Sequence, residues 1–298
     1  MSNADLNYDS PSSIRQVMEQ AGLAVSKRFG QNFLIDRGVR ARIVDALEVS
    51  QGMLVWEIGP GIGAMTGLML ERGVRLAAFE IDYGFVRFLR ERYGTQPGFS
   101  VVEGDMLKTW RAQPEKPDRI FGNLPYNAAF PIIADLLERD CVPPIMVFTL
   151  QKEAAHRLAA RPGTKDYSSL SVLCASVCEA RILFDIGASS FWPQPRVTSS
   201  VVRLTPSASP VPPELRRPFS TFVRAAFSTR RKTMRNALQA WAHAQLSALT
   251  DQEFSAVFAG ALASLGKPAE IRAEALSPEE LFRLFSLLSR EAASIASP

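Results

Sequence analysis

A glycine-rich segment followed by a distant carboxylate is the first chemical feature of the chain. Residues 57–63 read Glu-Ile-Gly-Pro-Gly-Ile-Gly, between an apolar run and a helix-spaced pattern. Glycine permits a tight turn and lets a ligand approach the backbone. Glu80, at the end of the next expected strand, can accept both hydroxyl groups of a ribose. The segment predicts a site for an adenosine-containing ligand, either a nicotinamide dinucleotide or S-adenosylmethionine; a tight turn without ligand is the alternative.

A third acid, Asp105, follows the third expected strand. At that strand end its carboxylate can accept a hydrogen bond from the exocyclic amine of an adenine, which favours an adenosyl site. Aspartate is also a common helix cap. Taken alone, the helix cap is the better interpretation of Asp105. The residue therefore favours S-adenosylmethionine over a nicotinamide dinucleotide only in part.

The strongest chemical signal follows the fourth expected strand, where the chain reads Asn123-Leu124-Pro125-Tyr126. Ligands of open α/β sheets bind at such strand ends. The Asn123 amide oxygen can accept a hydrogen bond, and Pro125 fixes the chain so that the preceding carbonyl can point into the site. Adenine N6 is a poor nucleophile, and two hydrogen-bond acceptors would hold the geometry of this nitrogen nearer to tetrahedral. The base, removed from its own stack, would pack on the Tyr126 ring. An ordinary turn is the alternative.

The spacing of apolar residues predicts alternating strands and helices from residue 53 onward. Expected strands cover 53–58, 74–80, 99–103, 119–122, 145–150, 181–186 and 199–204. Expected helices cover 64–72, 83–93, 128–139, the segment after 150 through 161, and 168–178. This order is typical of an α/β fold with a parallel, Rossmann-like sheet and helices on both faces.

A proline-rich segment marks a change in the chain. Four prolines lie between residues 206 and 213, and the pattern beyond them is helical to the end. Such composition is typical of a linker. We therefore expect an amino-terminal arm over 1–26, a catalytic domain over 27–206 and a small helical domain over 207–298. For the arm, both disorder and a short helix over 12–20 stay open.

The composition excludes several classes of protein. The chain has 298 residues and a net charge of +4, with 47% hydrophobic and 21% charged residues, which excludes a disordered or fibrous protein. No apolar run approaches the roughly 18 residues that cross a bilayer, and no secretory signal is visible. Three cysteines without a Cys-x-x-Cys pattern and two histidines argue against a disulfide framework and a metal site. We expect a reduced, cytoplasmic protein with no membrane association and no metal.

Positive charge is concentrated in one part of the chain. Residues 215–250 contain no Asp or Glu, but they hold Arg216, Arg217, Arg224, Arg230, Arg231, Lys232 and Arg235. Arginine and lysine can neutralise nucleic-acid phosphates and release counterions. A solvated helix face is the alternative, and charge alone slightly favours it.

Several ordered motifs resemble one enzyme family. The segments 57–63 and 123–126 are similar to those of N6-adenine methyltransferases that act on nucleic acids. Phe-Gly-Gln-Asn-Phe-Leu at 29–34, Leu-Gln-Lys-Glu at 150–153 and Phe-Trp-Pro-Gln-Pro-Arg-Val at 191–197 resemble those of the ribosomal RNA adenine dimethyltransferases. The basic segment 226–236 resembles part of the helical domain of the bacterial small-subunit enzyme. The resemblance runs from about residue 27 to 285.

The resemblance implies a cofactor, a substrate and site residues. The cofactor is S-adenosylmethionine, without a metal. The substrate is two adjacent adenosines in the 3′-terminal hairpin loop of small-subunit (16S) rRNA, each dimethylated at N6 on the immature small ribosomal subunit during ribosome biogenesis. The implied cofactor-binding residues are Asn32, Leu34, Gly59, Gly61, Glu80, Asp105 and Asn123. The implied catalytic residues are Asn123, Leu124, Pro125, Tyr126 and Phe191, whose exposed ring would stack on the adenine.

RNA binding is assigned to basic residues, and other functions stay open. The residues are Lys27, Arg28, Arg224, Arg230, Arg231, Lys232 and Arg235. We expect a monomer. A large-subunit rRNA dimethyltransferase of the antibiotic-resistance type would share the site, and a small-subunit assembly factor would act mainly by binding. A DNA adenine methyltransferase lacks an obvious major-groove reader here, and a dehydrogenase lacks a hydride-transfer acid or base.

Overall fold

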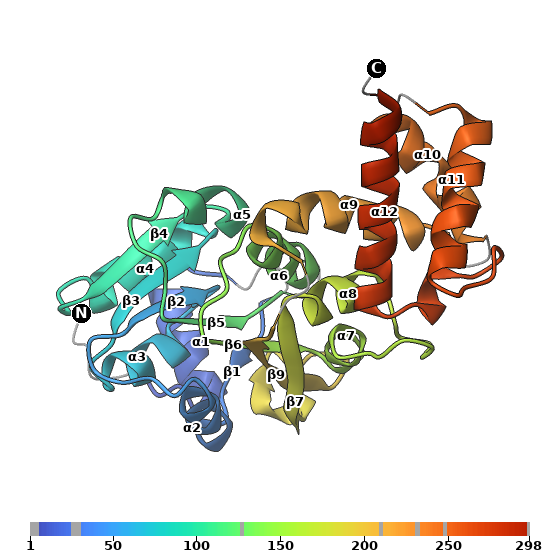
Figure 1. Ribbon diagram of the computed structural model, residues 1–298. Coiled ribbons are helices and arrows are strands. Elements are labelled where there is room, and N and C mark those ends of the chain that lie inside the picture. Colours follow the sequence, from blue (N-terminus) through green and yellow to red (C-terminus); the bar gives the residue numbers. More distant parts are fainter. Residues whose placement is uncertain are drawn as a thin grey trace. The chain divides into compact units, whose positions relative to one another are not determined.

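The computed structural model describes residues 6–24, 31–125, 128–208, 211–229, 233–246 and 249–296, with side chains as far as residue 290. The chain divides into two compact units (Figure 1). Unit 1 comprises Met1–Asp135, Cys141–Ala155 and Ala180–Pro206. Unit 2 comprises Leu136–Asp140, His156–Glu179 and Ser207–Pro298.

Unit 1 is built around a sheet whose strands, within the described residues, follow the order β4-β3-β2-β5-β6-β9-β7. The strands are β2 (Leu54–Ile58), β3 (Arg75–Glu80), β4 (Phe99–Glu103), β5 (Arg119–Asn123), β6 (Ile145–Gln151), β7 (Cys178–Ile186) and β9 (Ser199–Pro206). Strands β2 to β6 pair in parallel, so that Ile58 lies opposite Phe79 on one side and Gly122 on the other. The predicted Rossmann-like α/β fold class is confirmed.

One edge of the sheet departs from the prediction of a wholly parallel arrangement. Strand β9 runs antiparallel to β6, with Phe148 opposite Val202. Parallel neighbours need a crossover, usually a helix. Residues 187–198, all of them described, join β7 to its neighbour β9 without an α-helix. The strand direction therefore changes at this end, and the sheet is mixed.

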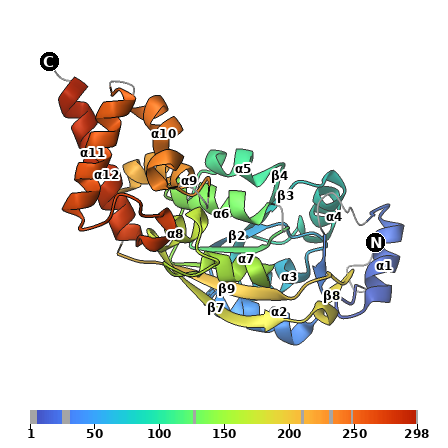
Figure 2. The same ribbon diagram turned by 90° about the vertical axis from the view of Figure 1, so that its right-hand side faces the viewer.

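Helices cover both faces of the sheet (Figures 1 and 2). They are α2 (Arg37–Ala46), α3 (Ala64–Leu70), α4 (Tyr83–Tyr93), α5 (Met106–Thr109), α6 (Ala129–Glu138) and α7 (Lys152–Leu158). On one face, Val55 belongs to the same buried cluster as Ile43 of α2 and Met65 of α3. The next residue of β2, Trp56, points the other way and contacts Trp110, with ring centroids 6.2 Å apart. A strand buried on both faces has a nearly continuous apolar sequence, and β6 is apolar except at Thr149 and at its last residue, Gln151.

A two-stranded ribbon was not predicted. Strands β1 (Phe33–Leu34) and β8 (Phe191–Trp192) pair antiparallel, with Leu34 opposite Phe191. Two residues are too few to give an alternating pattern. The ribbon joins two motifs that lie far apart in the sequence.

The described part of the amino-terminal arm is a packed helix rather than a disordered segment. Helix α1 (Pro11–Gln20) begins at the cap Ser10, whose side chain accepts a hydrogen bond from the Ser13 amide, and has proline at its first position. Its buried residues Ile14 and Met18 share an apolar cluster with Phe33 and Phe85. The arm therefore folds as part of unit 1.

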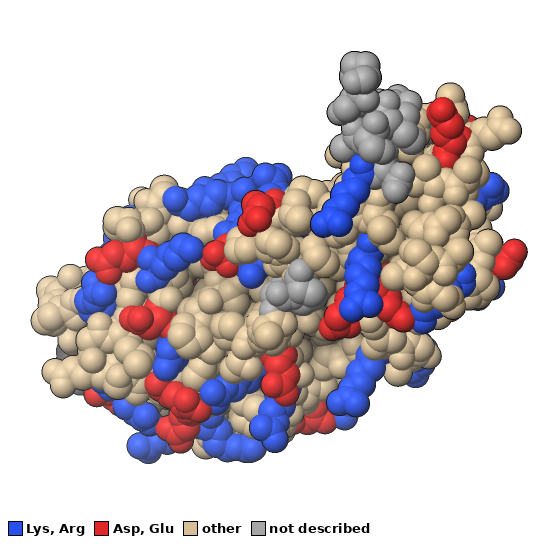
Figure 3. All heavy atoms as spheres, in the orientation of Figure 1, with Lys and Arg blue, Asp and Glu red and all other residues tan. Residues whose placement is uncertain are grey.

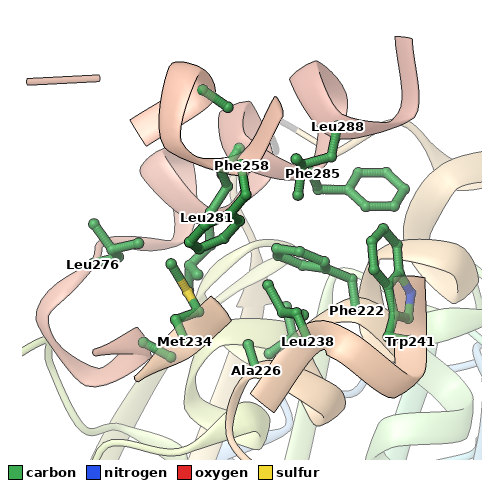
Figure 4. Packing of buried hydrophobic residues seen from close by; sticks show 14 of the residues in the cluster. Phe222, Ala226, Met234, Leu238, Trp241, Phe258, Leu276, Leu281, Phe285 and Leu288 are labelled. Carbon is green, nitrogen blue, oxygen red and sulfur yellow. The ribbon is translucent and has the colours of Figure 1, made fainter. Parts of the chain in front are cut away.

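Unit 2 is a helical bundle with its own apolar core. Its helices are α8 (Ser169–Ala175), α9 (Arg216–Ala226), α10 (Met234–Gln245), α11 (Asp251–Ser264) and α12 (Pro278–Ala296). Figure 4 shows the rings of Phe222, Trp241 and Phe285 turned toward one another. The centroid of the Phe222 ring lies 5.0 Å from that of Trp241 and 5.6 Å from that of Phe285. These contacts join α9, α10 and α12.

The division into units differs from the predicted domains. The last segment of unit 2 begins at Ser207, where the boundary was placed, but residues 156–179 also belong to unit 2 rather than to the catalytic domain. The reason is burial, because Tyr167 and Val172 lie in the core of the bundle and Tyr167 donates a hydrogen bond to the Leu276 carbonyl. Val211, within the proline-rich segment, is buried in the same core. The segment is therefore not a free linker at that point.

Candidate functional site

A cavity of about 470 Å³ opens where the parallel strands of unit 1 end. Its lining includes the residues that directly follow β2 to β5 and residues of the β1–β8 ribbon. Of the predicted cofactor-binding and catalytic residues, those that line it are Asn32, Leu34, Gly59, Gly61, Glu80, Asp105, Asn123, Leu124, Pro125 and Phe191. The remaining one, Tyr126, lies outside the described residues. The sheet thus brings together motifs separated by more than a hundred residues.

The glycine-rich segment turns into the cavity through backbone angles that other residues rarely adopt. Gly59, Gly61 and Gly63 have φ angles of 71°, 56° and 79°. A Cβ atom on Gly61 would lie 2.9 Å from Cε1 of Phe33, and one on Gly63 would lie 2.7 Å from Cε2 of Tyr93. Glycine is therefore required at 61 and 63 by space as well as by conformation.

Glu80 is held at the end of β3 with its carboxylate in the cavity wall. Its side chain accepts hydrogen bonds from the amides of Gly61 (3.1 Å) and Asp82 (2.9 Å). Burial raises the pKa of Glu80, and the two amides act in the opposite direction. The carboxylate is therefore fixed in place, with lone pairs left for further donors such as ribose hydroxyls.

Glu57 is a site residue that the sequence reasoning did not assign, although it opens the glycine-rich motif. It is 1% exposed and lines the cavity, and the Thr66 hydroxyl donates to it at 2.6 Å. Burial raises the pKa of Glu57 to about 8, with a smaller contribution from Glu80. A buried carboxylate of this kind is stabilised by a positive charge placed beside it. The signal available in the sequence was an acid at the end of an otherwise apolar strand.

Asn123 is oriented by a contact between distant parts of the chain. Its Nδ2 donates to the backbone carbonyl of Asn32, 2.9 Å away. Because the amide nitrogen is used in this way, the remaining polar atom of the side chain is the acceptor Oδ1. The structure thus places a hydrogen-bond acceptor, Asn123 Oδ1, at the end of β5, where the sequence analysis expected one.

Asp105 has both of the roles that its sequence position suggested, a helix cap and a residue of the ligand site. Asp105 caps α5, accepting from the Leu107 amide at 3.0 Å, and also lines the cavity. The cap and the ligand-facing interpretations therefore coexist.

Phe191 was expected to present an exposed ring, but it is 2% exposed because its pairing with Leu34 draws it into the core of the sheet. It still contributes to the cavity wall.

The predicted RNA-binding residues are only partly described. Arg224 and Arg235 lie exposed on α9 and α10 of unit 2, and Arg224 forms an ion pair with Glu138. Lys27, Arg28, Arg230, Arg231 and Lys232 lie outside the described residues. Arg216, at the start of the same basic stretch, is 8% exposed and pairs with Asp140 at 2.6 Å. Figure 3 shows Lys and Arg interspersed with Asp and Glu over the visible face.

The described parts of the chain contain neither a metal-ligand cluster nor a membrane-spanning helix. No cluster of three or more His, Cys, Asp or Glu side chains there is arranged to hold a metal ion. No helix in the same parts combines the length and apolar character needed to span a membrane.

The fold and the cavity define an α/β protein with a cavity at the ends of parallel strands, the place where open α/β sheets bind their ligands. The model of the ribosomal RNA adenine dimethylase family matches residues 22–259. The chain belongs to this family, which is a family of methyltransferases.

Individual relatives agree with this assignment. The chain is 45% identical over 240 residues to the "Ribosomal RNA small subunit methyltransferase A" of Treponema denticola, covering 79% of this chain and 82% of the relative. It is 40% identical to the protein of the same name from Hahella chejuensis, over 89% of this chain and 93% of the relative. A crystal structure of a dimethyladenosine transferase from Plasmodium falciparum has the same fold, with a TM-score of 0.69, 24% identity and coverage of 84% and 94%.

The raised pKa of Glu57 predicts a specific pH dependence of stability. Between the usual glutamate pKa and about 8, the folded protein binds one more proton at Glu57 than the unfolded chain, so stability falls as pH rises through this range. We expect Glu57→Gln to remove that loss, which is on the order of 3–5 kcal/mol at about 1.4 kcal/mol per pKa unit. Urea unfolding of the ligand-free protein at pH 5, 7 and 9 measures it. Glu91→Gln, at an exposed position, is the control; the same pH profile for wild type and Glu57→Gln would contradict the assignment.

Proposed function

We propose that the chain transfers methyl groups from S-adenosylmethionine to N6 of two adjacent adenosines in the 3′-terminal hairpin loop of small-subunit rRNA. The proposed product is a pair of dimethyladenosines made during biogenesis of the small subunit. The observation that carries the proposal is the oriented Asn123 amide in a cavity that also holds Glu57 and Glu80. The names of the two curated relatives support the small subunit as the source of the RNA.

The residues of the cavity fit S-adenosylmethionine, which supplies an electrophilic methyl group on a sulfonium when bound. Glu80 suits the ribose hydroxyls, and Asp105 suits the exocyclic amine of the adenine. A cationic ligand beside Glu57 would lower the raised pKa of this residue and favour its charged form, which would then balance the positive charge of the ligand. Gly59 and Gly61 line the cavity without side chains, so a ligand can approach their backbone closely, and Asn32 and Leu34 line the cavity from the ribbon side.

The target adenine would be held by the corner after β5. Asn123 Oδ1 and a backbone carbonyl of the segment 124–125 accept the two N6 protons, which directs the nitrogen lone pair toward the methyl carbon. Tyr126 stacks on the base, and Phe191 supports the opposite wall. Transfer is direct, and the proton leaves N6 only after its acidity rises on methylation. The protein therefore acts by positioning and by fixed dipoles.

The relatives, which are named small-subunit rRNA methyltransferases, do not favour the two alternative functions. A large-subunit rRNA dimethyltransferase would use the same cavity, and the distinction lies in the RNA that unit 2 accepts. A small-subunit assembly factor would need binding but no oriented acceptor, so the fixed Asn123 amide and the buried acids favour catalysis. We propose a cytoplasmic monomer that acts on the immature small ribosomal subunit.

Methyl transfer from labelled S-adenosylmethionine to purified small and large ribosomal subunits that lack adenine dimethylation tests the proposal. We expect label on two adjacent adenosines of small-subunit RNA. Label confined to large-subunit RNA would assign the protein to the resistance type. Tight binding to the small subunit without any label would favour the assembly factor.

Asn123→Ala should abolish most turnover and leave RNA binding unchanged. Removal of one fixed polar group at a reacting centre typically lowers kcat by about 100- to 1,000-fold. Asn123→Asp keeps an acceptor but cannot donate to the Asn32 carbonyl, so a smaller loss is expected. Single-turnover methylation and RNA titration separate the two effects, and wild-type turnover in Asn123→Ala would refute the role of the acceptor.

Replacement of Arg230, Arg231 and Lys232 by Ala should weaken RNA binding and reduce its dependence on salt. Each lost phosphate contact lowers the slope of log K against log salt by roughly one. A matched control removes three arginines of unit 1 that are ion-paired with acids: Arg72, Arg75 and Arg90. An unchanged slope in the first variant, or an equal change in the control, would place the RNA surface elsewhere.

A further inference from the structure

The amino-terminal arm contacts the side of the glycine-rich loop that faces away from the ligand cavity. The Tyr8 hydroxyl lies 3.1 Å from the Ile62 carbonyl and 2.8 Å from the Tyr93 hydroxyl. The Tyr93 hydroxyl in turn lies 3.1 Å from the Gly63 carbonyl. Residues 59 and 61 of the same loop line the cavity. Two tyrosines, one of them from the arm, therefore hold the end of the loop.

The hydroxyl protons limit how these contacts are made. Tyr8 and Tyr93 together have two protons for three contacts. If Tyr8 donates to Tyr93, the chain of hydrogen bonds ends on the Gly63 carbonyl. If Tyr93 donates to Tyr8, it ends on the Ile62 carbonyl. In a third arrangement each hydroxyl donates to its own carbonyl and accepts from the Arg92 guanidinium, which hydrogen-bonds both tyrosines. The two hydroxyls and Arg92 therefore form one network.

Tyr8 is held in place by both polar and apolar contacts. The guanidinium groups of Arg40 and Arg92 lie over its ring, with Cζ atoms 5.6 and 5.5 Å from the ring centroid. Arg40 is buried and forms an ion pair with Asp9, the next residue of the arm. The ring of Tyr8 also packs against the apolar cluster that contains Ile62. Tyr8→Phe keeps the ring and its packing, so it removes the contribution of the hydroxyl alone.

Helix α1 holds the same loop through its apolar face. Ile14 and Met18 share a buried cluster with Ile62 and with Phe33 of the ribbon. Figure 2 shows α1 beside α4, the helix that ends at Tyr93. The arm thus contacts residue 62 through both its side chain and its carbonyl, and it supports the ribbon that carries Leu34 and Phe191.

We propose that Tyr8 is a positioning residue and that the arm holds the glycine-rich loop in its ligand-binding conformation. A loop with glycine at 59, 61 and 63 has many accessible backbone conformations when it is free. Contacts that restrict the loop beforehand reduce the entropy lost when the cofactor binds. By reciprocity, cofactor binding must then stabilise the docked arm by the same free energy. The inference rests on the proposed cofactor site, and it assigns a function to a segment that precedes the family match at residue 22.

Calorimetric titration with S-adenosylhomocysteine tests the proposal in four full-length proteins: wild type, Tyr8→Phe, Tyr93→Phe and the double variant. We expect Tyr8→Phe to raise Kd by about 3- to 10-fold, the equivalent of one hydrogen bond. The double variant should raise Kd by less than the product of the single effects, because the hydroxyls belong to one network. Tyr83→Phe, an exposed tyrosine at the start of α4, is the matched control and should bind as wild type does.

Steady-state methylation distinguishes positioning from a general loss of structure. The KM for S-adenosylmethionine should rise in Tyr8→Phe, while kcat at saturation and the KM for RNA stay at their wild-type values. Failure of the wild type to bind S-adenosylhomocysteine would overturn the proposed cofactor site rather than the role of the arm. Equal Kd values for wild type and Tyr8→Phe would overturn the role of the arm.

Limited proteolysis gives the reciprocal measurement and does not depend on catalysis. Arg15 is an exposed tryptic site within α1. Bound S-adenosylhomocysteine should slow cleavage after Arg15 in the wild type by about the same factor as that between the Kd values of Tyr8→Phe and wild type. The slowing should be smaller in Tyr8→Phe. Cleavage at the same rate with and without ligand in the wild type would contradict the coupling.

Discussion

The burial of two carboxylates at neighbouring strand ends is the constraint on which the site depends. Glu57 and Glu80 are 1% and 4% exposed, and burial raises the pKa of each. Buried acids destabilise a fold unless donors or positive charges compensate them. The chain supplies donors from Thr66, Gly61 and Asp82. With its pKa raised to about 8, Glu57 is mostly protonated at neutral pH in the ligand-free protein, and a positive charge bound beside it would favour the ionised form.

The neighbouring structure follows from the need to keep these groups in place. Parallel pairing of β2 with β3 places both acids at one edge of the sheet. The turn between β2 and α3 must pass close to the ligand, which requires glycine, and glycine makes the turn flexible. The two tyrosine hydroxyls and the apolar face of α1 offset that flexibility from the far side. Rigidity at the site is therefore provided by elements that do not touch the ligand.

The sequence predicted the parts of the molecule whose signal is local. Apolar runs located β2 to β6, and the glycines and strand-end acids located the cavity, because these depend on residue type and nearby spacing. The strand β9 was predicted, but its antiparallel direction and the β1–β8 ribbon were not, since pairing partners are set by the tertiary fold. The same reason explains why residues 156–179 pack with the bundle, and why Phe191 is buried although its motif indicated an exposed ring.

The hydrogen bond between Asn123 and Asn32 shows what such long-range pairing adds to a motif. Asparagine alone offers both a donor and an acceptor, and either could face a substrate. The Asn32 carbonyl accepts from the amide nitrogen and fixes the rotation of the side chain, so Oδ1 is held at a set position at the strand end. Asn32 directly precedes β1, whose position depends on pairing with β8 and on Phe33 packing against Phe85 of α4. The orientation of the Asn123 amide thus depends on a ribbon of two short strands, which links residues near 32, 123 and 191 although they lie far apart in the sequence.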